Sequence, residues 1–242
     1  MQVWFDDIKR QFILNFITDD RWKFLLNGLI VTLRITFFAL LIGIVIGVVV
    51  AIVRSTYDKN ADKMRRGAGR FLLGFFNGIC KFYITVIRGT PVVVQLMIFY
   101  FVILVRVRDG ELIGLIAFGI NAGAYIAEIF RSGIMSIDNG QFEAGRSLGL
   151  NYIQTMQYIV IPQAFKNILP TLANEFIVLL KETAVVGYLA VQDLTKAGDI
   201  IRGRTFSAFM PLFAVALIYL VLVVFFSWLV SKLERRLRAS ER

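Results

Sequence analysis

The chain has 242 residues, 57% of them apolar, and a formal net charge of +10. Soluble domains are usually about 45–50% apolar, so this composition favours a chain that lies in a membrane. The sequence contains no histidine and one cysteine, which excludes imidazole-dependent catalysis and an internal disulfide. The basic residues lie beside apolar runs, a placement typical of the cytoplasmic flanks of membrane spans rather than of nucleic-acid binding.

Residues 1–27 form an expected amphipathic lead-in, whose aromatic residues suit a membrane surface. The first span is expected at about residues 28–53. Small residues recur in this span at every fourth position, as Ala39, Gly43, Gly47 and Ala51. Because such a stripe lets a second helix approach closely, we expect it to serve helix packing rather than contact with a solute.

Two segments carry a dense positive charge. The first has six basic residues: Arg54, Lys59, Lys63, Arg65, Arg66 and Arg70. The second is the tail, residues 232–242, which has five basic residues in its eleven positions. Lysine and arginine accumulate on the cytoplasmic side of membrane proteins, so both segments are expected to be cytoplasmic.

Four further apolar regions predict the rest of a transmembrane domain that covers residues 28–231. Residues 71–105 are too long for one span and break at Arg88 to Pro91, which predicts an inclined helix, a break, and a span ending near Val105. Later spans are expected at about 112–135, from 162 or 168 to 180, and 205–231. A lipid-facing backbone must satisfy its own hydrogen bonds. We therefore expect an all-α integral membrane protein of about five transmembrane helices, with the N-terminus outside and the C-terminus in the cytoplasm.

A polar insert, residues 141–170, interrupts the apolar regions. Asp138 with Gln141, and Asn151 with Gln154, have the spacing of a helix cap and a side chain that reaches back to it. Two short helices are therefore expected to start near residues 139 and 152. Gly149 lies between them, where a left-handed conformation closes one helix and turns the chain.

The first helix of the insert carries a surface of small residues flanked by Phe142 and Leu148. Such a surface suits close docking by a partner, and the alternative is an ordinary pair of helices lying flat on the membrane. Pro162 is expected to end or kink the second helix, because its ring removes a backbone donor.

A family resemblance rests on this insert. The run Glu143-Ala144-Gly145, Gly149 and Ile159 to Pro162 is similar to the cytoplasmic-loop signature E-A-A-x3-G-x9-I-x-L-P of the membrane subunits of ATP-binding-cassette importers. Gly145 stands in place of the second alanine and Ile161 in place of the leucine. Stretches similar to the polar amino acid permease branch follow in order over most of the chain: residues 27–36, 86–96, 124–134, 140–150, 161–170 and 174–187. The first 26 residues are outside this resemblance.

The resemblance implies a permease subunit that pairs with a second permease subunit, either another copy or a paralogue, around a central path. It also implies two separate ATPase subunits, which bind ATP and Mg²⁺, and an extracytoplasmic amino acid-binding protein. The coupling loop, about residues 138–161, would dock into the ATPase. Its coupling residues would be Glu143, Ala144, Gly145, Ser147, Leu148, Gly149, Ile159 and Pro162. The sequence has no G-x4-G-K-[ST] phosphate loop, so we expect ATP to bind to another polypeptide and this chain to hold no cofactor or metal.

Polar residues within apolar regions are candidates for the solute path, because ionisable groups at depth in a membrane need a partner or a path. Arg88 is the first candidate for contact with a solute carboxylate or for a gate. Glu128 lies three residues before Arg131, and a structural ion pair is favoured there. Glu175 has two roles open to it, binding an α-amino group or pairing between helices. The remaining candidates are Thr90, Gln95, Tyr100, Asn121 and Asn174, for which packing between helices is the default.

The sequence thus predicts a transport subunit, not an enzyme, in a bacterial plasma membrane, for polar or charged amino acids. The alternative is a secondary transporter or channel driven by an ion gradient. Against this alternative stand the docking insert and the absence of evident inverted repeats. A membrane-embedded enzyme is disfavoured because the chain lacks histidine and paired catalytic carboxylates.

Overall fold

A computed structural model of the protein describes residues 2–61, 64 and 67–239, and in these residues all regular structure is helical. The all-α prediction is confirmed. The predicted cytoplasmic residues Lys63, Arg65 and Arg66, and the last three residues of the tail, lie outside the described residues.

The N-terminal part consists of two helices joined by a tight turn. Helix α1 spans Gln2–Phe12 and continues through a π-helical turn, Ile13–Ile17, and a 3-10 turn, Thr18–Asp20. Helix α2 then runs over 39 residues, Trp22–Asn60. It starts before the expected position 28 and ends after position 53. At 1.5 Å per residue it is ~58 Å long, well beyond the ~30 Å of a hydrocarbon core.

The predicted break after Arg88 is present, but the crossing helix lies before it. Helix α3 spans Ala68–Gly89, and after Thr90 and Pro91 helix α4 runs over Val92–Ile98 into a π-helical turn, Phe99–Ile103. Twelve residues rise only ~18 Å, so the predicted span that ends near Val105 is wrong. Apolar residues lie on both sides of the break, so the sequence pattern did not show on which side the full-length helix lies.

Helix α5, Gly110–Met135, is the central helix. In its most apolar stretch, 61% of the residues are buried. It packs along α2 at the stripe of small residues. A methyl group added to Gly43 would lie 2.9 Å from Cβ of Ala122, and one added to Gly47 would lie 2.6 Å from Cγ2 of Ile126. Both distances are below normal van der Waals contact, so only glycine permits this approach. The prediction that the stripe serves packing is confirmed.

The polar insert forms α6, Asn139–Ser147, and α7, Tyr152–Thr155. A π-helical turn, Met156–Val160, joins α7 to α8, Ile161–Glu182. Pro162 lies in the first turn of α8, where the missing donor has little cost. The helical ribbon therefore continues from α7 into α8 instead of ending at the proline.

The C-terminal part contains a 3-10 helix, Thr183–Leu189, then α9, Leu194–Thr205, and α10, Phe209–Ala239. The expected start of the last span at residue 205 is wrong, because the chain turns at Phe206, whose φ is 53°. The uncharged run from Thr205 to Ser231 crosses this turn. Composition therefore predicted one continuous span where the structure has the end of α9, a turn and α10.

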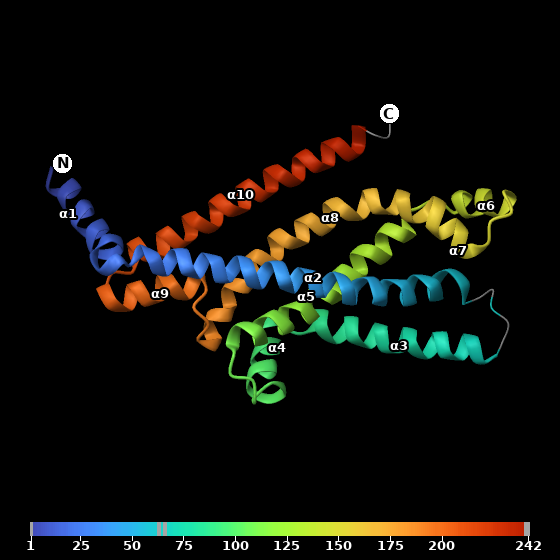
Figure 1. Ribbon diagram of the computed structural model, residues 1–242, viewed down its shortest axis with the longest axis horizontal. Coiled ribbons are helices and arrows are strands. Elements are labelled where there is room, and N and C mark those ends of the chain that lie inside the picture. Colours follow the sequence, from blue (N-terminus) through green and yellow to red (C-terminus); the bar gives the residue numbers. More distant parts are fainter. Residues whose placement is uncertain (1, 62–63, 65–66, 240–242) are drawn as a thin grey trace.

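In the part of the chain that the structure describes, four helices are long and apolar enough to cross a membrane: α2, α3, α5 and α10. The fifth expected span corresponds to α8, which has 22 residues but also carries Lys166, Glu175, Lys181 and Glu182. It runs lengthwise through the bundle, from the insert at one end toward α9 at the other (Figure 1). The charged residues explain why α8 does not reach the hydropathy of the other four.

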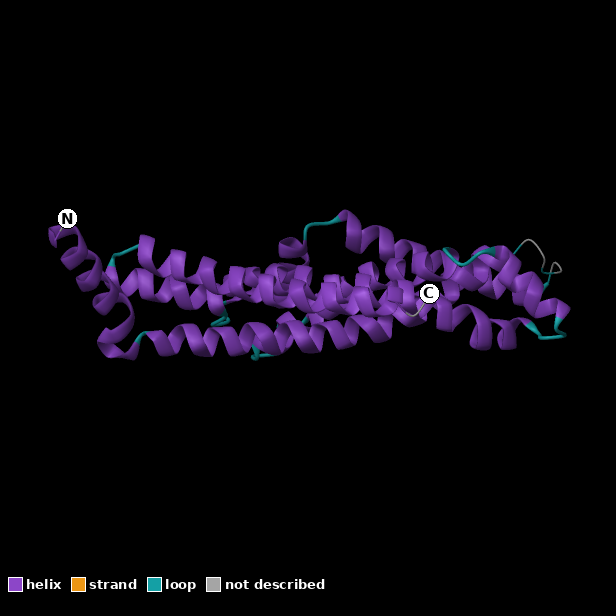
Figure 2. Ribbon diagram, turned by 90° about the horizontal axis from the view of Figure 1, so that it is seen from above, coloured by secondary structure: helices purple, strands orange, loops and turns teal. Residues whose placement is uncertain are grey.

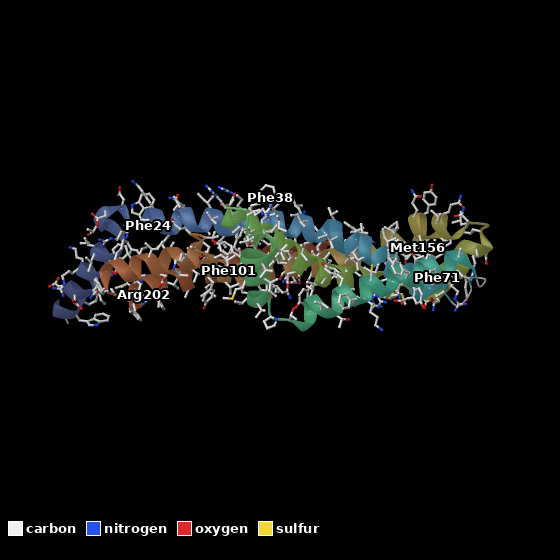
Figure 3. All side chains as sticks on the ribbon, turned by 90° about the horizontal axis from the view of Figure 1, so that it is seen from below. Phe24, Phe38, Phe71, Phe101, Met156 and Arg202 are labelled. Carbon is white, nitrogen blue, oxygen red and sulfur yellow. The ribbon has the colours of Figure 1, made fainter. Side chains whose placement is uncertain are left out.

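The helices form an elongated bundle with two distinct ends (Figures 1 and 2). The last turn of α2, the start of α3 and the insert α6–α7 lie at one end, and α1 and α9 lie at the other (Figure 1). Large apolar side chains on the outside of the bundle are exposed, among them Phe38, Phe71 and Phe101, which are 47%, 74% and 61% exposed (Figure 3). An apolar exterior of this kind fits a lipid solvent.

Candidate functional site

The insert is an angular pair of helices whose corner is defined by backbone hydrogen bonds. Leu150 N donates to Gly145 O at 3.0 Å, and Gly149 N donates to Arg146 O at 2.9 Å. These two bonds form a Schellman motif, which needs a left-handed residue after the helix. Gly149 supplies it with a φ of 77°. The left-handed conformation predicted for Gly149 is confirmed.

Side-chain caps start both helices of the insert, at the predicted positions. Asn151 accepts from Gln154 N, and Gln154 Oε1 accepts from Asn151 N, both at 2.9 Å, which completes a capping box. Asp138 caps α6 through Gly140 N. Gln141 does not reach back as predicted, because its Oε1 accepts from Gln163 Nε2 at 3.1 Å. Instead, Gln141 links α6 to the start of α8.

Gly145 packs inside the insert, so it is not part of its outer face. A Cβ at this position would lie 2.6 Å from Oγ1 and Cγ2 of Thr155 on α7. Gly145 and Thr155 are both buried. The small side chain is therefore used within the chain, where it lets α6 and α7 meet at backbone distance and makes the pair one packed unit.

The other predicted coupling residues of α6, together with apolar residues of α7 and the π-helical turn, are exposed, and this exposed set is called the coupling face below. Glu143, Ala144 and Ser147 are exposed, and Leu148, Ile153 and Tyr158 are 75%, 73% and 65% exposed. Ile153 and Tyr158 were not predicted as part of this surface. The cap at Asn151 could have indicated Ile153, which lies in the first turn of the helix that follows it. Ile159 is half-buried and Pro162 is exposed. Three large apolar side chains on a polar loop mark a surface that suits a protein partner.

The insert is joined to the spans on two sides. Gly133 of α5 is in close contact with Ile168 of α8, and Asn167 Nδ2 donates to Ser136 Oγ at 3.2 Å. Ile134, Ile137, Val160, Ala164 and Ile168 form a small apolar core at this junction. Phe142 of α6 and Met156 of the π-helical turn pack on this core, so the insert is in contact with both α5 and α8.

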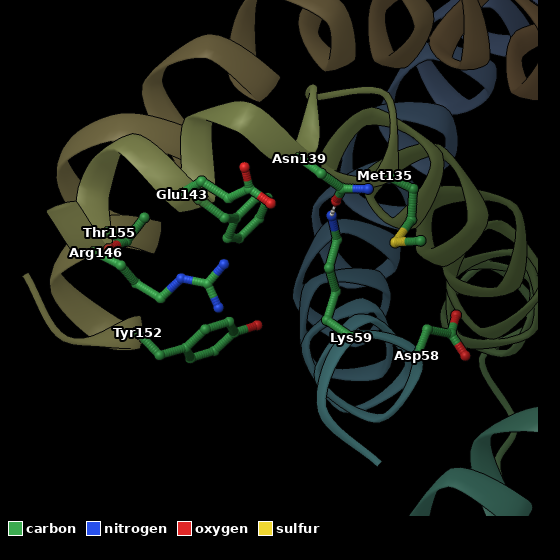
Figure 4. A pocket seen from close by; sticks show the side chains of 9 residues that line it. Asp58, Lys59, Met135, Asn139, Glu143, Arg146, Tyr152 and Thr155 are labelled. Atoms are coloured by element: carbon green, nitrogen blue, oxygen red, sulfur yellow. Dashed lines mark hydrogen bonds between the residues drawn. The ribbon is translucent and has the colours of Figure 1, made fainter. Parts of the chain in front are cut away.

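A cavity of about 490 Å³ lies between the insert and the end of α2. Asp58 and Lys59 line one wall, and Glu143, Arg146 and Tyr152 line the opposite wall (Figure 4). The cavity makes this junction less closely packed than the glycine contacts of α2 with α5.

The second candidate region is the break between α3 and α4. Gln95 Nε2 donates to Ile87 O at 2.7 Å, to Thr90 O at 3.0 Å and to Thr90 Oγ1 at 2.7 Å. Asn121 Nδ2 of α5 donates to Gln95 Oε1 at 2.9 Å. Gln95 and Asn121 are 7% and 3% exposed. These predicted path residues thus satisfy the backbone that the break frees, and they fix the break to α5.

Arg88 is held at the edge of this break and remains exposed. Its guanidinium carbon lies 5.2 Å from the ring centroid of Tyr125 on α5. It is also near enough to interact electrostatically with Glu128 and with Glu175 of α8. Arg88 of α3, Glu128 of α5 and Glu175 of α8 are called the charged cluster below; among the described residues no ion pair at hydrogen-bond distance joins Arg88 to either carboxylate. Tyr125 was missed, because a lone tyrosine in an apolar helix gives no pattern.

The remaining predicted path residues make other contacts. Arg131 Nη2 pairs with Glu128 at 2.9 Å, as expected, and Arg131 Nη1 also pairs with Asp58 at 3.3 Å. Asn174 Nδ2 donates to Pro170 O of its own helix at 3.2 Å. Tyr100 packs on the core formed by α2, α4 and α5. Among the described residues, no three histidine, cysteine, aspartate or glutamate side chains group as metal ligands do.

Comparison with known proteins gives a consistent result. The family of binding-protein-dependent transport system inner membrane components matches residues 67–239. The putative glutamine transport system permease protein GlnP of Rickettsia typhi is 35% identical over 217 residues, which are 88% of this chain and 93% of that protein. The arginine transport system permease protein ArtQ of Bacillus subtilis is 36% identical over 222 residues, 90% of this chain and 94% of that protein.

Solved structures agree with the sequence relatives. A crystal structure of an amino acid ABC transporter with histidines superposes with a TM-score of 0.79 at 39% identity, covering 91% of this chain and 98% of that chain. An inward-facing MetNI methionine ABC transporter superposes with a TM-score of 0.74 at 20% identity, covering 89% and 97%, and shares the fold. The chain belongs to the family of inner membrane components of binding-protein-dependent transport systems.

Proposed function

We propose that this family member is the permease subunit of an ATP-driven importer that moves polar or charged amino acids across a bacterial plasma membrane. The single observation that carries the coupling part of the proposal is the exposed coupling face, with Leu148, Ile153 and Tyr158 open to solvent on a rigid helix pair. The amino acid class is supported by the glutamine and arginine permeases that the chain resembles.

The coupling face docks on a separate ATPase subunit, which holds ATP and Mg²⁺. Glu143, exposed on α6, supplies a carboxylate for a basic residue of that subunit, and the apolar side chains supply the buried area. A second permease subunit and an extracytoplasmic binding protein complete the assembly. The N-terminus, α1 and α9 lie outside, and the insert and the C-terminus lie in the cytoplasm.

Motion reaches the spans because the insert is rigid. Closure of the two ATPase subunits draws the docked helix pairs together, and the contact of Gly145 with Thr155 prevents α6 from sliding over α7. The displacement passes into α8, which continues from α7 through the π-helical turn, and into α5 at Gly133. Access to the path between the permease subunits then alternates between the two sides of the membrane.

The charged cluster provides the chemistry for a zwitterionic solute. The Arg88 guanidinium, exposed beside the Tyr125 ring, binds a carboxylate, and Glu175 binds an α-amino group. Glu128 is paired with Arg131. It therefore does not bind the solute directly and affects it only through its negative charge. Gln95, Thr90 and Asn121 hold Arg88 in place through the break.

Reconstituted transport tests the proposal. The complete complex in proteoliposomes, with binding protein and labelled glutamine or arginine on the outer side of the importer, is supplied with ATP and Mg²⁺ on the ATPase side. We expect uptake only with hydrolysable ATP, and no uptake when the ATPase subunits are omitted. Uptake driven by an ion gradient without ATP would identify a secondary transporter and overturn the proposal.

A further inference from the structure

The last turn of α2 contacts the start of the insert. Lys59 Nζ donates to Asn139 Oδ1 at 3.2 Å and lies 4.1 Å from the ring centroid of Phe142. Both partners belong to α6, 80 positions or more along the chain from Lys59. An ammonium group over an aromatic face is attracted by the ring quadrupole, so one side chain joins the two elements by a hydrogen bond and a cation–π contact.

The neighbouring residue makes a second contact at the same end. Asp58 Oδ2 pairs with Arg131 Nη1 of α5 at 3.3 Å, and the two side chains are 24% and 27% exposed. The end of α2 is thereby fixed to α5 by Asp58 and to α6 by Lys59. The contact continues into α7, because the Phe142 and Tyr152 rings are stacked with centroids 6.5 Å apart and planes 17° apart.

A cavity occupies part of the space between α2 and the insert. On one side of Lys59 the two elements are separated by the 490 Å³ cavity, whose far wall carries Glu143 and Arg146 (Figure 4). By contrast, α2 and α5 are packed at glycine distance along the stripe. A displacement of the rigid insert must therefore either carry the end of α2 with it through Lys59 or break that contact.

We propose that Lys59 is a positioning residue for α6, and that through Lys59 the motion of the insert is transmitted to α2 as well as to α8. This inference rests on the proposed function. When the ATPase moves α6, the Lys59 contact transfers the motion to α2, and the stripe of small residues passes it to α5. The charged cluster that contains Arg88 and Glu128 is then moved from both sides.

The experiment uses the complete complex in proteoliposomes and three variants. Lys59→Met keeps the apolar stem and removes the ammonium group, and Lys59→Arg keeps a cation over Phe142. Arg70→Met is the matched control, since it removes a positive charge from α3 at the same end of the bundle. The measured quantities are solute transported per ATP hydrolysed, and the spin-label distance between positions 56 and 146 with and without ATP, in a Cys80→Ser background.

In the parent complex we expect the distance between positions 56 and 146 to stay constant when ATP is added. In Lys59→Met we expect it to change with ATP, and the solute transported per ATP to fall about fivefold, while ATP hydrolysis stays within about twofold. Lys59→Arg retains most of the coupling, and Arg70→Met behaves as the parent complex.

A Lys59→Met complex with the parent's coupling ratio and label distance overturns the inference and leaves the proposed function standing. Absence of ATP-dependent uptake in the parent complex overturns the proposed function itself. If Lys59→Met does not assemble, Phe142→Leu decides in the same way, because it removes the ring beneath the ammonium group and leaves Lys59 in place. An unchanged coupling ratio in Phe142→Leu also overturns the inference.

Discussion

The α2–α5 interface and the corner of the insert both depend on glycine, but for different reasons. Gly43 and Gly47 bring two long helices together, and a Cβ there would overlap Ala122 or Ile126. A Cβ added at Gly149 would have no described atom within 4 Å, and glycine is needed there for its φ of 77°. Glycine sets the separation of the helices in the α2–α5 interface and the direction of the chain at the corner of the insert. A substitution should therefore affect stability in the interface and coupling at the corner.

The largest expected effect is loss of stability from Gly47→Leu. The new side chain would overlap Ile126 and approach Ala127 N, where a Cβ alone would lie 3.0 Å away. Overpacking of a close contact costs about 1–3 kcal/mol or more, so the free energy of unfolding should fall by at least this amount. Thermal unfolding in detergent, followed by size-exclusion chromatography, measures the change.

Gly78→Leu on α3 is the matched control for Gly47→Leu, because no described atom lies within 4 Å of a Cβ at Gly78. Its unfolding temperature should match that of the parent protein or exceed it slightly. An equal loss of stability in both variants would show that Gly47 matters only as a flexible residue and not as a contact.

The second effect is on coupling. Gly149→Pro removes the donor to Arg146 O and imposes a φ near −65°, against the 77° of the corner. The two insert helices would change their relative direction while the spans remain folded. We expect uptake to fall by about tenfold or more, since a strain of about 1–2 kcal/mol or above acts directly on docking.

Gly149→Asn serves as the control, since asparagine tolerates the left-handed conformation better than other side chains. It should retain most of the uptake, and its unfolding temperature should equal that of Gly149→Pro. Full uptake by the proline variant would contradict the role of the corner.

A smaller effect is expected inside the insert. Gly145→Ala places a methyl group 2.6 Å from Thr155 Oγ1, so α6 and α7 must separate. The loss is limited because both helices lie at the surface, and we expect uptake to fall about threefold to tenfold, as for about 1 kcal/mol of strain. Adding Thr155→Ala removes the overlapping atoms and should restore part of the uptake, measured in the same proteoliposomes. Two losses that simply add would contradict direct contact between these positions.

The sequence predicted the local features of both regions and missed what depends on the partner of each glycine. Gly149 could be predicted because a left-handed corner after a helix favours glycine regardless of tertiary packing. Gly145 was expected on a docking surface, and it is in fact buried against Thr155. The spacing in α6 could not show this, because the residue that contacts Gly145 lies on α7, beyond the turn at Gly149.

The same limit applied to the spans. Hydropathy predicted the α2 span, since a long apolar run has one interpretation. It placed the crossing helix on the wrong side of the break at Pro91, because the hydrogen bonds that stabilise the break come from Gln95 and from Asn121 of another helix. A polar residue whose partner is far along the chain gives no local pattern.

The smallest effect is expected for Arg88→Leu, which alters neither glycine region. Arg88 is exposed and contacts Tyr125 without an ion pair at hydrogen-bond distance among the described residues. The unfolding temperature and the solute transported per ATP should therefore be unchanged. Only the affinity for a carboxylate-bearing solute should fall, by about threefold, for the loss of one exposed charge-assisted contact. Uptake kinetics measured with glutamine, with Arg88→Lys as the charge-preserving control, test this. If the concentration dependence is identical in Arg88→Leu, then the break serves only to orient α4, and recognition of the solute carboxylate lies elsewhere in the assembly.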